Sequence, residues 1–202
     1  MTDKPMDVQS PGYSSSLSRR RFLQLGLAGT AALVLPSAAL GVESGYVFAS
    51  RPSRPALPNR QLNLYNVHTG DRLEVEYFID GRYEPEAIAA LNHLLRDHRN
   101  GQTKSIDPRL FDLVATLNRK LTSRMPTEII SGYRSPSTNA RLRRHSRGVA
   151  KNSYHVKGRA LDIRIPGYRP SQVNRVARGL KAGGVGRYRK FVHIDTGPVR
   201  FW

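Results

Sequence analysis

Alternation of hydrophobic and polar residues predicts two strands that lie far apart in the sequence. Along residues 159–165, three aliphatic side chains fall on one face, and a small residue and two charged residues fall on the other: Leu161, Ile163 and Ile165 against Ala160, Asp162 and Arg164. Along residues 191–195, the alternation places Val192 and Ile194 on one face and His193 on the opposite face. A period of two is typical of a strand with one buried face. Each segment is therefore expected to bury its aliphatic side and to present polar groups on the other.

The remaining patterns predict a mixture of helices and strands. Two alternating runs around a Gly-containing turn predict a β-hairpin at residues 61–77. Asp107 is expected to be the N-cap of a helix, because Pro108 and an apolar stripe follow it. Helices are expected at residues 85–98, 108–121, 137–144 and from a Ser171 cap to the Gly183-Gly184 pair, with strands at 127–131 and about 185–188. The predicted fold class is α+β, an antiparallel sheet with flanking helices in a single compact domain.

The N-terminal part of the chain has the composition of an export segment. The run Ser18-Arg19-Arg20-Arg21-Phe22 precedes a modestly apolar stretch at residues 25–42, and it resembles a bacterial twin-arginine signal. Residues 1–41 are therefore interpreted as a twin-arginine signal region, either cleaved or retained as an anchor, with an ordinary helix as the third alternative. Residues 42–60 are interpreted as a Pro/Arg-rich linker, which leaves 61–202 as the candidate catalytic domain.

Charge and cysteine content narrow the classes of chemistry. The chain carries 33 Lys and Arg against 15 acidic residues, and it has no cysteine. A thiolate metal site or a cysteine nucleophile is thereby excluded. Beyond Glu128 there are seventeen Lys and Arg but only two acids, Asp162 and Asp195. A field of this sign indicates an anionic partner, and the two remaining carboxylates are candidates for a functional site.

Two histidines complete a candidate metal site. His155 precedes Gly158, which allows the backbone to turn toward the strand that carries Asp162. If the two predicted strands are neighbours, Asp162 and His193 lie side by side with His155 above them. Two imidazoles and one carboxylate form a usual ligand set for a catalytic zinc that keeps one position open.

These residues carry a resemblance to a known family. His155-x-x-Gly158-x-Ala160-x-Asp162 followed by a late strand His193 resembles the zinc peptidases grouped with lysostaphin, the D-alanyl-D-alanine metallopeptidases and the hedgehog domain. The run from Ser131 to Ser135, Ser-Gly-Tyr-Arg-Ser, is most similar to the exported murein endopeptidase branch. The resemblance implies one Zn²⁺ per chain and murein peptides as substrate. It also implies a periplasmic or cell-envelope location, with either endopeptidase or D,D- or L,D-carboxypeptidase activity.

The resemblance also suggests roles for residues around the metal. It implies that Arg134 binds substrate and stabilises charge on the carbonyl oxygen; the alternative is a structural ion pair, disfavoured because carboxylates are scarce nearby. Tyr133 is placed with it as a substrate-binding residue, and Ser153 is expected to contact substrate or the backbone of the site. Related peptidases place an acid or a His just before the last ligand, and this chain has none there. Asp195 is therefore the candidate general base or orienter of His193, the alternative being a turn residue.

The same positive charge also supports an alternative hypothesis, in which the protein is not an enzyme. A strongly basic exported protein could bind murein without hydrolysing it, and the zinc content of the purified protein would separate the two readings. Nucleic acid is not an expected partner, because the chain is predicted to be exported and its aromatic spacing matches no recognition motif. A retained signal would anchor the protein in the membrane.

Overall fold

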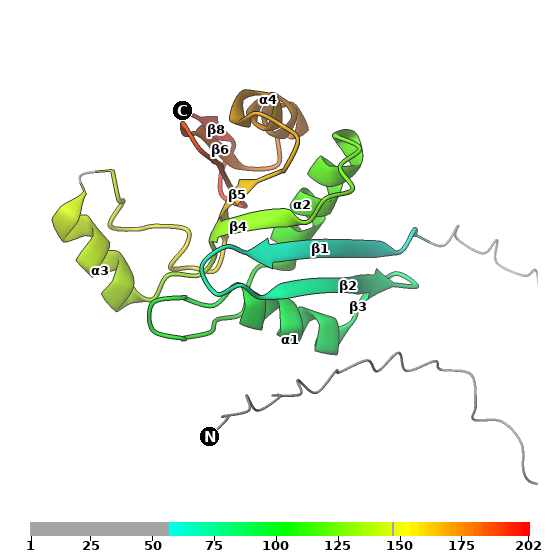
Figure 1. The fold of residues 1–202 in the computed structure, drawn as a ribbon, viewed down its shortest axis with the longest axis horizontal. Helices are drawn as coiled ribbons and strands as arrows, with labels where there is room; N and C mark the ends of the chain where they lie inside the picture. The colour runs from blue at the N-terminus through cyan, green and yellow to red at the C-terminus, as the bar shows by residue number, and fades with distance from the viewer. Residues whose placement is uncertain (1–56, 147) are drawn as a thin grey trace, which may run out of the picture. The chain divides into compact units, whose positions relative to one another are not determined.

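Eight strands form one sheet in the computed structural model, which describes residues 57–146 and 148–202 (Figure 1). Their order across the sheet is β3-β2-β1-β4-β5-β7-β6-β8. Most neighbours are antiparallel, whereas β1 with β4 and β6 with β8 are parallel. The strands are β1 Arg60–Asn66, β2 Arg72–Ile79, β3 Arg82–Tyr83, β4 Thr127–Ser131, β5 Ala160–Arg164, β6 Gly184–Arg187, β7 Val192–Asp195 and β8 Arg200–Phe201. The predicted hairpin and the α+β class are confirmed.

Four helices are present in the described part of the chain, and each begins with a proline in its first turn. A proline there loses no helical hydrogen bond, and its fixed φ already suits the helix. The helices are α1 Pro85–Leu94, α2 Pro108–Lys120, α3 Pro136–His145 and α4 Pro170–Leu180. The Asp107 side chain accepts a hydrogen bond from the Arg109 backbone N–H, as expected of an N-cap.

The helix boundaries that matter most for the prediction differ at the start of α4 and at the end of α1. The expected Ser171 cap is wrong, because Arg169 is the N-cap of α4 and its backbone N–H donates to the Gln172 side chain at 2.8 Å. Helix α1 ends at Leu94, whereas the sequence predicted an end at residue 98. The chain leaves the helix there because the Leu95 carbonyl accepts from the backbone N–H of Tyr133, a contact that no local pattern reveals.

The hydrophobic core lies between the sheet and its helices. Helices α1 and α2 pack against β2 and β1, and α4 packs against β6 and β7. The aliphatic faces of the two predicted strands are buried in this core, together with the apolar stripes of the helices, including Leu91, Leu110, Leu117, Leu161, Ile163, Val173 and Ile194. Burial of these faces fixes which side of each strand is left for polar groups.

Strands β5 and β7 are neighbours, as predicted. Their register places Asp162 directly opposite His193 and Ile163 opposite Val192. Side chains that face each other on one side of an antiparallel pair lie within contact distance. The fold therefore brings together two polar residues that are 31 positions apart in the sequence.

The proposed signal region and almost all of the proposed linker lie outside the described residues. Among those that the structure describes, no helix is long and apolar enough to cross a membrane.

Candidate active site

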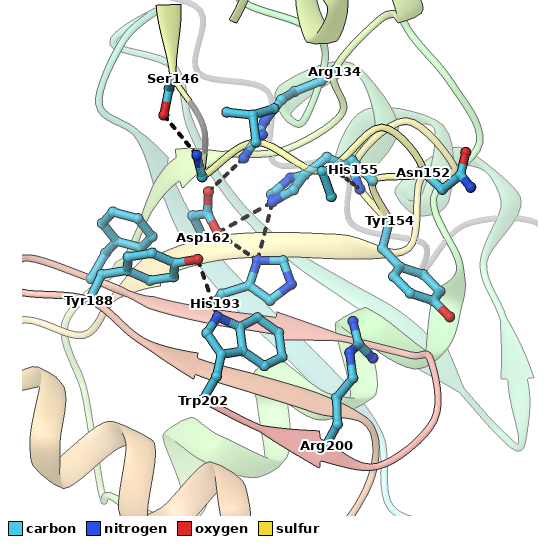
Figure 2. A pocket seen from close by; sticks show the side chains of 15 residues that line it. Arg134, Ser146, Asn152, Tyr154, His155, Asp162, Tyr188, His193, Arg200 and Trp202 are labelled. Atoms are coloured by element: carbon cyan, nitrogen blue, oxygen red, sulfur yellow. Dashed lines mark hydrogen bonds and ion pairs between the residues drawn. The ribbon is translucent and has the colours of Figure 1, made fainter. Parts of the chain in front are cut away.

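Three side chains from three different segments converge at one point (Figure 2). Asp162 comes from β5, His193 from β7 and His155 from the loop between α3 and β5. The Asp162 Oδ1 atom lies 2.8 Å from His193 Nδ1 and 3.3 Å from His155 Nε2. The two imidazole nitrogens, His155 Nε2 and His193 Nδ1, are themselves 3.3 Å apart. One donor atom from each residue thus lies within 4.8 Å of the other two, and all three residues are buried.

Each imidazole has an acceptor behind it. His155 Nδ1 lies 2.8 Å from the carbonyl oxygen of Gly132, and His193 Nε2 lies 3.1 Å from Asp195 Oδ2. Such acceptors hold the ring proton on the outward nitrogen, which leaves the inward nitrogen free to donate a lone pair to a cation. Two nitrogens and one carboxylate oxygen facing one another fit a divalent metal ion.

Close backbone contacts with the segment between α1 and α2 position the loop that carries His155 and the residues that follow β4. Gly158 has a φ of +68°, and a Cβ atom on it would lie 2.5 Å from the Ser105 carbonyl oxygen. A Cβ on Gly132 would lie 2.4 Å from the Leu95 carbonyl oxygen. Only glycine fits both the turn and the close approach. These two glycines therefore allow the Gly132 carbonyl to reach the ring of His155.

Burial and charge act against each other on the three ionisable groups. Burial alone would raise the pKa of Asp162, but the two histidines beside it outweigh burial and hold that pKa below its usual range. Burial lowers the pKa of His155. Burial acts the same way on His193, but the carboxylates of Asp162 and Asp195 raise its pKa above the ordinary value. A cation at this point would compete with a proton for His193 Nδ1.

Arg134 forms an ion pair within the site. Its Nη2 donates to Asp162 Oδ2 at 2.9 Å and its Nε donates to Ser131 Oγ at 3.0 Å. The prediction that a structural ion pair is disfavoured here is therefore wrong, because the scarce carboxylate that Arg134 meets is Asp162, the candidate metal ligand. The pairing occupies Oδ2 of Asp162 and leaves Oδ1 facing the histidines. Arg134 also lines the groove above the site.

Asp195 lies behind His193 and is fully buried. Its Oδ1 accepts from the backbone N–H groups of Gly184 and Gly197 at 3.1 and 2.8 Å. Its two oxygens also receive the Arg200 guanidinium, at 3.1 Å for Oδ1 and 2.6 Å for Oδ2. Burial would raise the pKa of Asp195, but the hydrogen bond with His193, together with those from Gly197, Arg200 and Gly184, holds it well below the usual range. Of the roles predicted for Asp195, this position suits the orienter of His193, because the carboxylate does not line the groove.

A groove of about 520 Å³ opens above the three residues. Arg134 lines it beside the loop at residues 148–150, and the opposite side is lined by Tyr188, Arg200 and Trp202. The Trp202 ring lies 5.3 Å from the His193 ring, and its Nε1 lies 3.3 Å from the Tyr188 hydroxyl. The sequence suggested that the terminal aromatics would line a groove or cover the sheet edge, but it gave no indication of Tyr188.

Tyr133 and Ser153, the other two predicted substrate-binding residues, lie in different surroundings, one in the core and one at the groove. Tyr133 is only 8 % exposed and belongs to the hydrophobic core, so the expectation that it binds substrate does not match its place. Arg134, the next residue, lines the groove, whereas the Tyr133 ring is packed in the core. Ser153 lines the groove, and its Oγ accepts from the backbone N–H of His155 at 3.3 Å. This is the contact with the site backbone that was one of its two predicted roles.

The fold and site define a class of protein, namely one with a buried His–Asp–His group suited to a single metal ion at the foot of an open groove. The model of the peptidase M15_2 family, described as peptidoglycan L,D-endopeptidase MepK, matches residues 54–202. The chain belongs to this family, and the prediction of a peptidase of the D-alanyl-D-alanine metallopeptidase group is confirmed. Its assignment to the branch exported by the twin-arginine route remains a prediction.

Relatives with related names align with nearly the whole chain. Peptidoglycan L,D-endopeptidase MepK of Escherichia coli strain K12 is 47 % identical over 188 residues, which is 92 % of this chain and 97 % of the relative. The probable peptidoglycan L,D-endopeptidase MepK of Haemophilus influenzae is 40 % identical over 188 residues, covering 92 % of this chain and 95 % of the relative. No solved structure matches the chain.

Proposed function

We propose that this protein is a zinc-dependent peptidoglycan endopeptidase that hydrolyses an L,D peptide bond in murein cross-links. The observation that carries the proposal is the convergence of His155, Asp162 and His193, each with one donor atom directed to a common point, at the foot of an open groove. The names of relatives that are 47 % and 40 % identical supply the substrate and the bond. A murein substrate agrees with a periplasmic or cell-envelope location.

Zinc is the metal that the donor set favours. Two imidazoles and one carboxylate are the ligands of many catalytic zinc sites, and they leave a coordination position open. When bound, the ion would supply a Lewis acid that polarises the scissile carbonyl and lowers the pKa of water. His155, Asp162 and His193 would hold it, one ion per chain.

Arg134 is placed to bind the substrate carbonyl. A guanidinium has five N–H donors, and Ser131 and Asp162 occupy only two of them. The remaining donors border the groove, where they can stabilise negative charge that develops on a carbonyl oxygen. The ion pair with Asp162 holds the guanidinium in place before substrate arrives, so little reorganisation is needed during the reaction.

Asp195 and Arg200 act on the reaction through His193. The carboxylate of Asp195 keeps the ring proton on Nε2 and fixes the ring plane, while Arg200 and two backbone N–H groups fix the carboxylate. Asp195 is therefore a positioning residue in this proposal. Among the described residues that line the groove, Asp162 is the only carboxylate, so no second acid stands beside it as a general base.

The deciding experiment combines metal analysis with digestion of defined muropeptides. We expect about one zinc per purified chain and, by mass spectrometry, cleavage inside the cross-link at the L,D bond. Asp162→Ala should abolish both zinc binding and hydrolysis, since it removes one ligand and leaves Arg134 unpaired in the site. Glu76→Ala is the matched control, because Glu76 is exposed on β2, away from the groove, and should retain both properties.

Two results would contradict the proposal. Release of only a terminal residue would identify a carboxypeptidase, and murein binding without zinc or hydrolysis would identify a binding protein.

A further inference from the structure

A second hollow, of about 390 Å³, lies between helix α4 and the end of strand β6. Four of its lining residues follow the spacing i, i+3, i+4, i+7 along α4, which places them on one stripe of the helix. Arg187 completes the lining from β6. The five residues are Ser171, Asn174, Arg175, Arg178 and Arg187.

The hollow lies on the opposite face of the sheet from the catalytic groove. In β6, Gly186 pairs with His193, and a Cβ on Gly186 would lie 2.4 Å from the Trp202 ring that borders the groove. Side chains alternate along a strand, so those of Val185 and Arg187 point to the face opposite to that of Gly186. Val185 is buried in the core on the face where α4 packs on the sheet, and Arg187 lies on this same face. A ligand in this hollow would therefore not compete with substrate.

The positive charge of the hollow is not neutralised within the described part of the chain. No ion pair there involves Arg175, Arg178 or Arg187, in contrast to the arginines that face acids elsewhere. The only acids beyond Glu128 are Asp162 and Asp195, which are paired to Arg134 and Arg200 in the catalytic site. Three exposed guanidinium groups thus line one hollow without a counter-charge from the described residues, and all three would attract an anion bound there.

Asn174, which also lines the hollow, has a covered side-chain donor without a partner in residues 57–146 and 148–202. Asn174 is 8 % exposed, and its Nδ2 has no hydrogen-bond acceptor among the described residues. A buried donor without an acceptor costs about 1–3 kcal/mol. This nitrogen is covered by the protein, so it is not counted among the donors that the hollow presents.

We propose that the hollow between α4 and β6 binds a phosphate group. A guanidinium presents two parallel N–H donors, and a carboxylate with two oxygens is satisfied by one such fork. Three guanidinium groups and the Ser171 hydroxyl offer more donors than a carboxylate accepts. A phosphate ester presents at least two free charged oxygens together with its ester oxygens, so it matches this donor set better.

An exposed aromatic side chain beside the hollow favours a phospholipid headgroup as the source of the phosphate. The Phe201 ring is 39 % exposed, and the Arg178 guanidinium lies 4.6 Å from its centroid. Val199, which precedes β8, is 52 % exposed. Cations next to exposed aromatic and aliphatic side chains are typical of surfaces that rest on the headgroup layer of a membrane.

The test compares two variants of equal charge. The hollow variant carries Arg175→Gln, Arg178→Gln and Arg187→Gln. The control carries Arg82→Gln, Arg119→Gln and Arg124→Gln, which remove three exposed arginines without described ion pairs from the other half of the chain. Binding to phosphatidylglycerol and phosphatidylcholine vesicles is measured by flotation, binding of inorganic pyrophosphate by calorimetry, and hydrolysis of soluble muropeptides serves as the check of folding.

We expect wild type to bind phosphatidylglycerol vesicles, and the hollow variant to lose about tenfold or more of that affinity, with pyrophosphate as a competitor. The control should lose much less, and all three proteins should hydrolyse soluble muropeptides equally. A second outcome is that wild type binds pyrophosphate but not vesicles, and that only the hollow variant loses pyrophosphate binding. This outcome would support the phosphate site, with a free phosphate and not a lipid as its ligand. Equal losses in both variants, or no binding of either probe by wild type, would overturn the proposal.

Discussion

At the scale of single residues, the orientation of each metal-site histidine depends on the acceptor behind its ring. The two acceptors differ in kind, because Gly132 offers a neutral carbonyl oxygen to His155 and Asp195 offers a charged carboxylate to His193. A charged acceptor makes the opposite ring nitrogen a better ligand. His193 should therefore be the ligand whose affinity depends most on its surroundings.

Replacing Asp195 by Asn tests this dependence. Asn keeps the size of the side chain but removes the negative charge that faces His193 and Arg200, so zinc affinity should fall about 10- to 100-fold. Competition with a chelator measures the affinity, and the absorption spectrum of the cobalt-substituted protein reports the altered ligand geometry. Circular dichroism checks that the variant is folded. A variant that binds zinc as tightly as wild type would mean that Asp195 is only a turn residue.

Gly158 and Gly70 allow two reasons for a glycine to be tested separately, namely a positive φ and a close approach of another backbone segment. Both have positive φ, +68° and +79°, but only at Gly158 would a Cβ meet the backbone, 2.5 Å from the Ser105 carbonyl oxygen. Gly158→Ala should lower the free energy of unfolding by about 2–4 kcal/mol and impair zinc binding by displacing His155. Gly70→Ala should cost only about 1 kcal/mol, with zinc binding unchanged. Urea denaturation measures the unfolding free energy of both variants, and metal analysis measures their zinc content. Equal losses of stability in the two variants would show that the close contact at Gly158 is unimportant.

At the scale of elements, the sequence predicted helices and strands correctly where neighbouring residues alone determine them. Pro85, and Asp107 with Pro108, marked the starts of α1 and α2, and alternation identified β5 and β7 and the faces that they bury. Sequence prediction failed where a long-range contact determines the structure, as at the early end of α1 at Leu94. The same reason explains the pairing of Arg134 with Asp162, because charge scarcity says nothing about which groups the fold brings together. The three predicted metal ligands converge because strand pairing follows from burial of the aliphatic faces.

The N-cap of α2 gives a pH-dependent contribution to stability. Burial would raise the pKa of Asp107, but hydrogen bonds from Arg109 and Thr196 outweigh burial and lower it to about 2. Because the unfolded value is about 3.9, the stabilisation is present above pH about 4 and is lost as the pH falls toward 2. Asp107→Asn should therefore be less stable than wild type at pH 7 by about 1 kcal/mol, because it weakens the charge-assisted hydrogen bonds from Arg109 and Thr196.

The difference in unfolding free energy between wild type and Asp107→Asn should shrink as the pH is lowered from 5 to 3. Urea titrations at each pH measure it. A difference that does not change with pH would mean that the cap acts through its shape and not through its charge.

At the scale of the whole catalytic domain, the two faces of the sheet carry different chemistry. The groove with Arg134 and Trp202 lies on one face, and the arginine-lined hollow at α4 lies on the other. If the hollow rests on a membrane, the groove is directed away from the lipid, toward the murein layer. The enzyme would then work at short range from the membrane surface without occupying its catalytic site.

Trp202 has a practical consequence of its own. It is the single tryptophan of the sequence, and its ring lies 5.3 Å from the imidazole of His193. Intrinsic indole fluorescence from this chain therefore originates at one place, the rim of the groove. Loading of the site and arrival of a peptide can both be followed by that emission in the unlabelled protein.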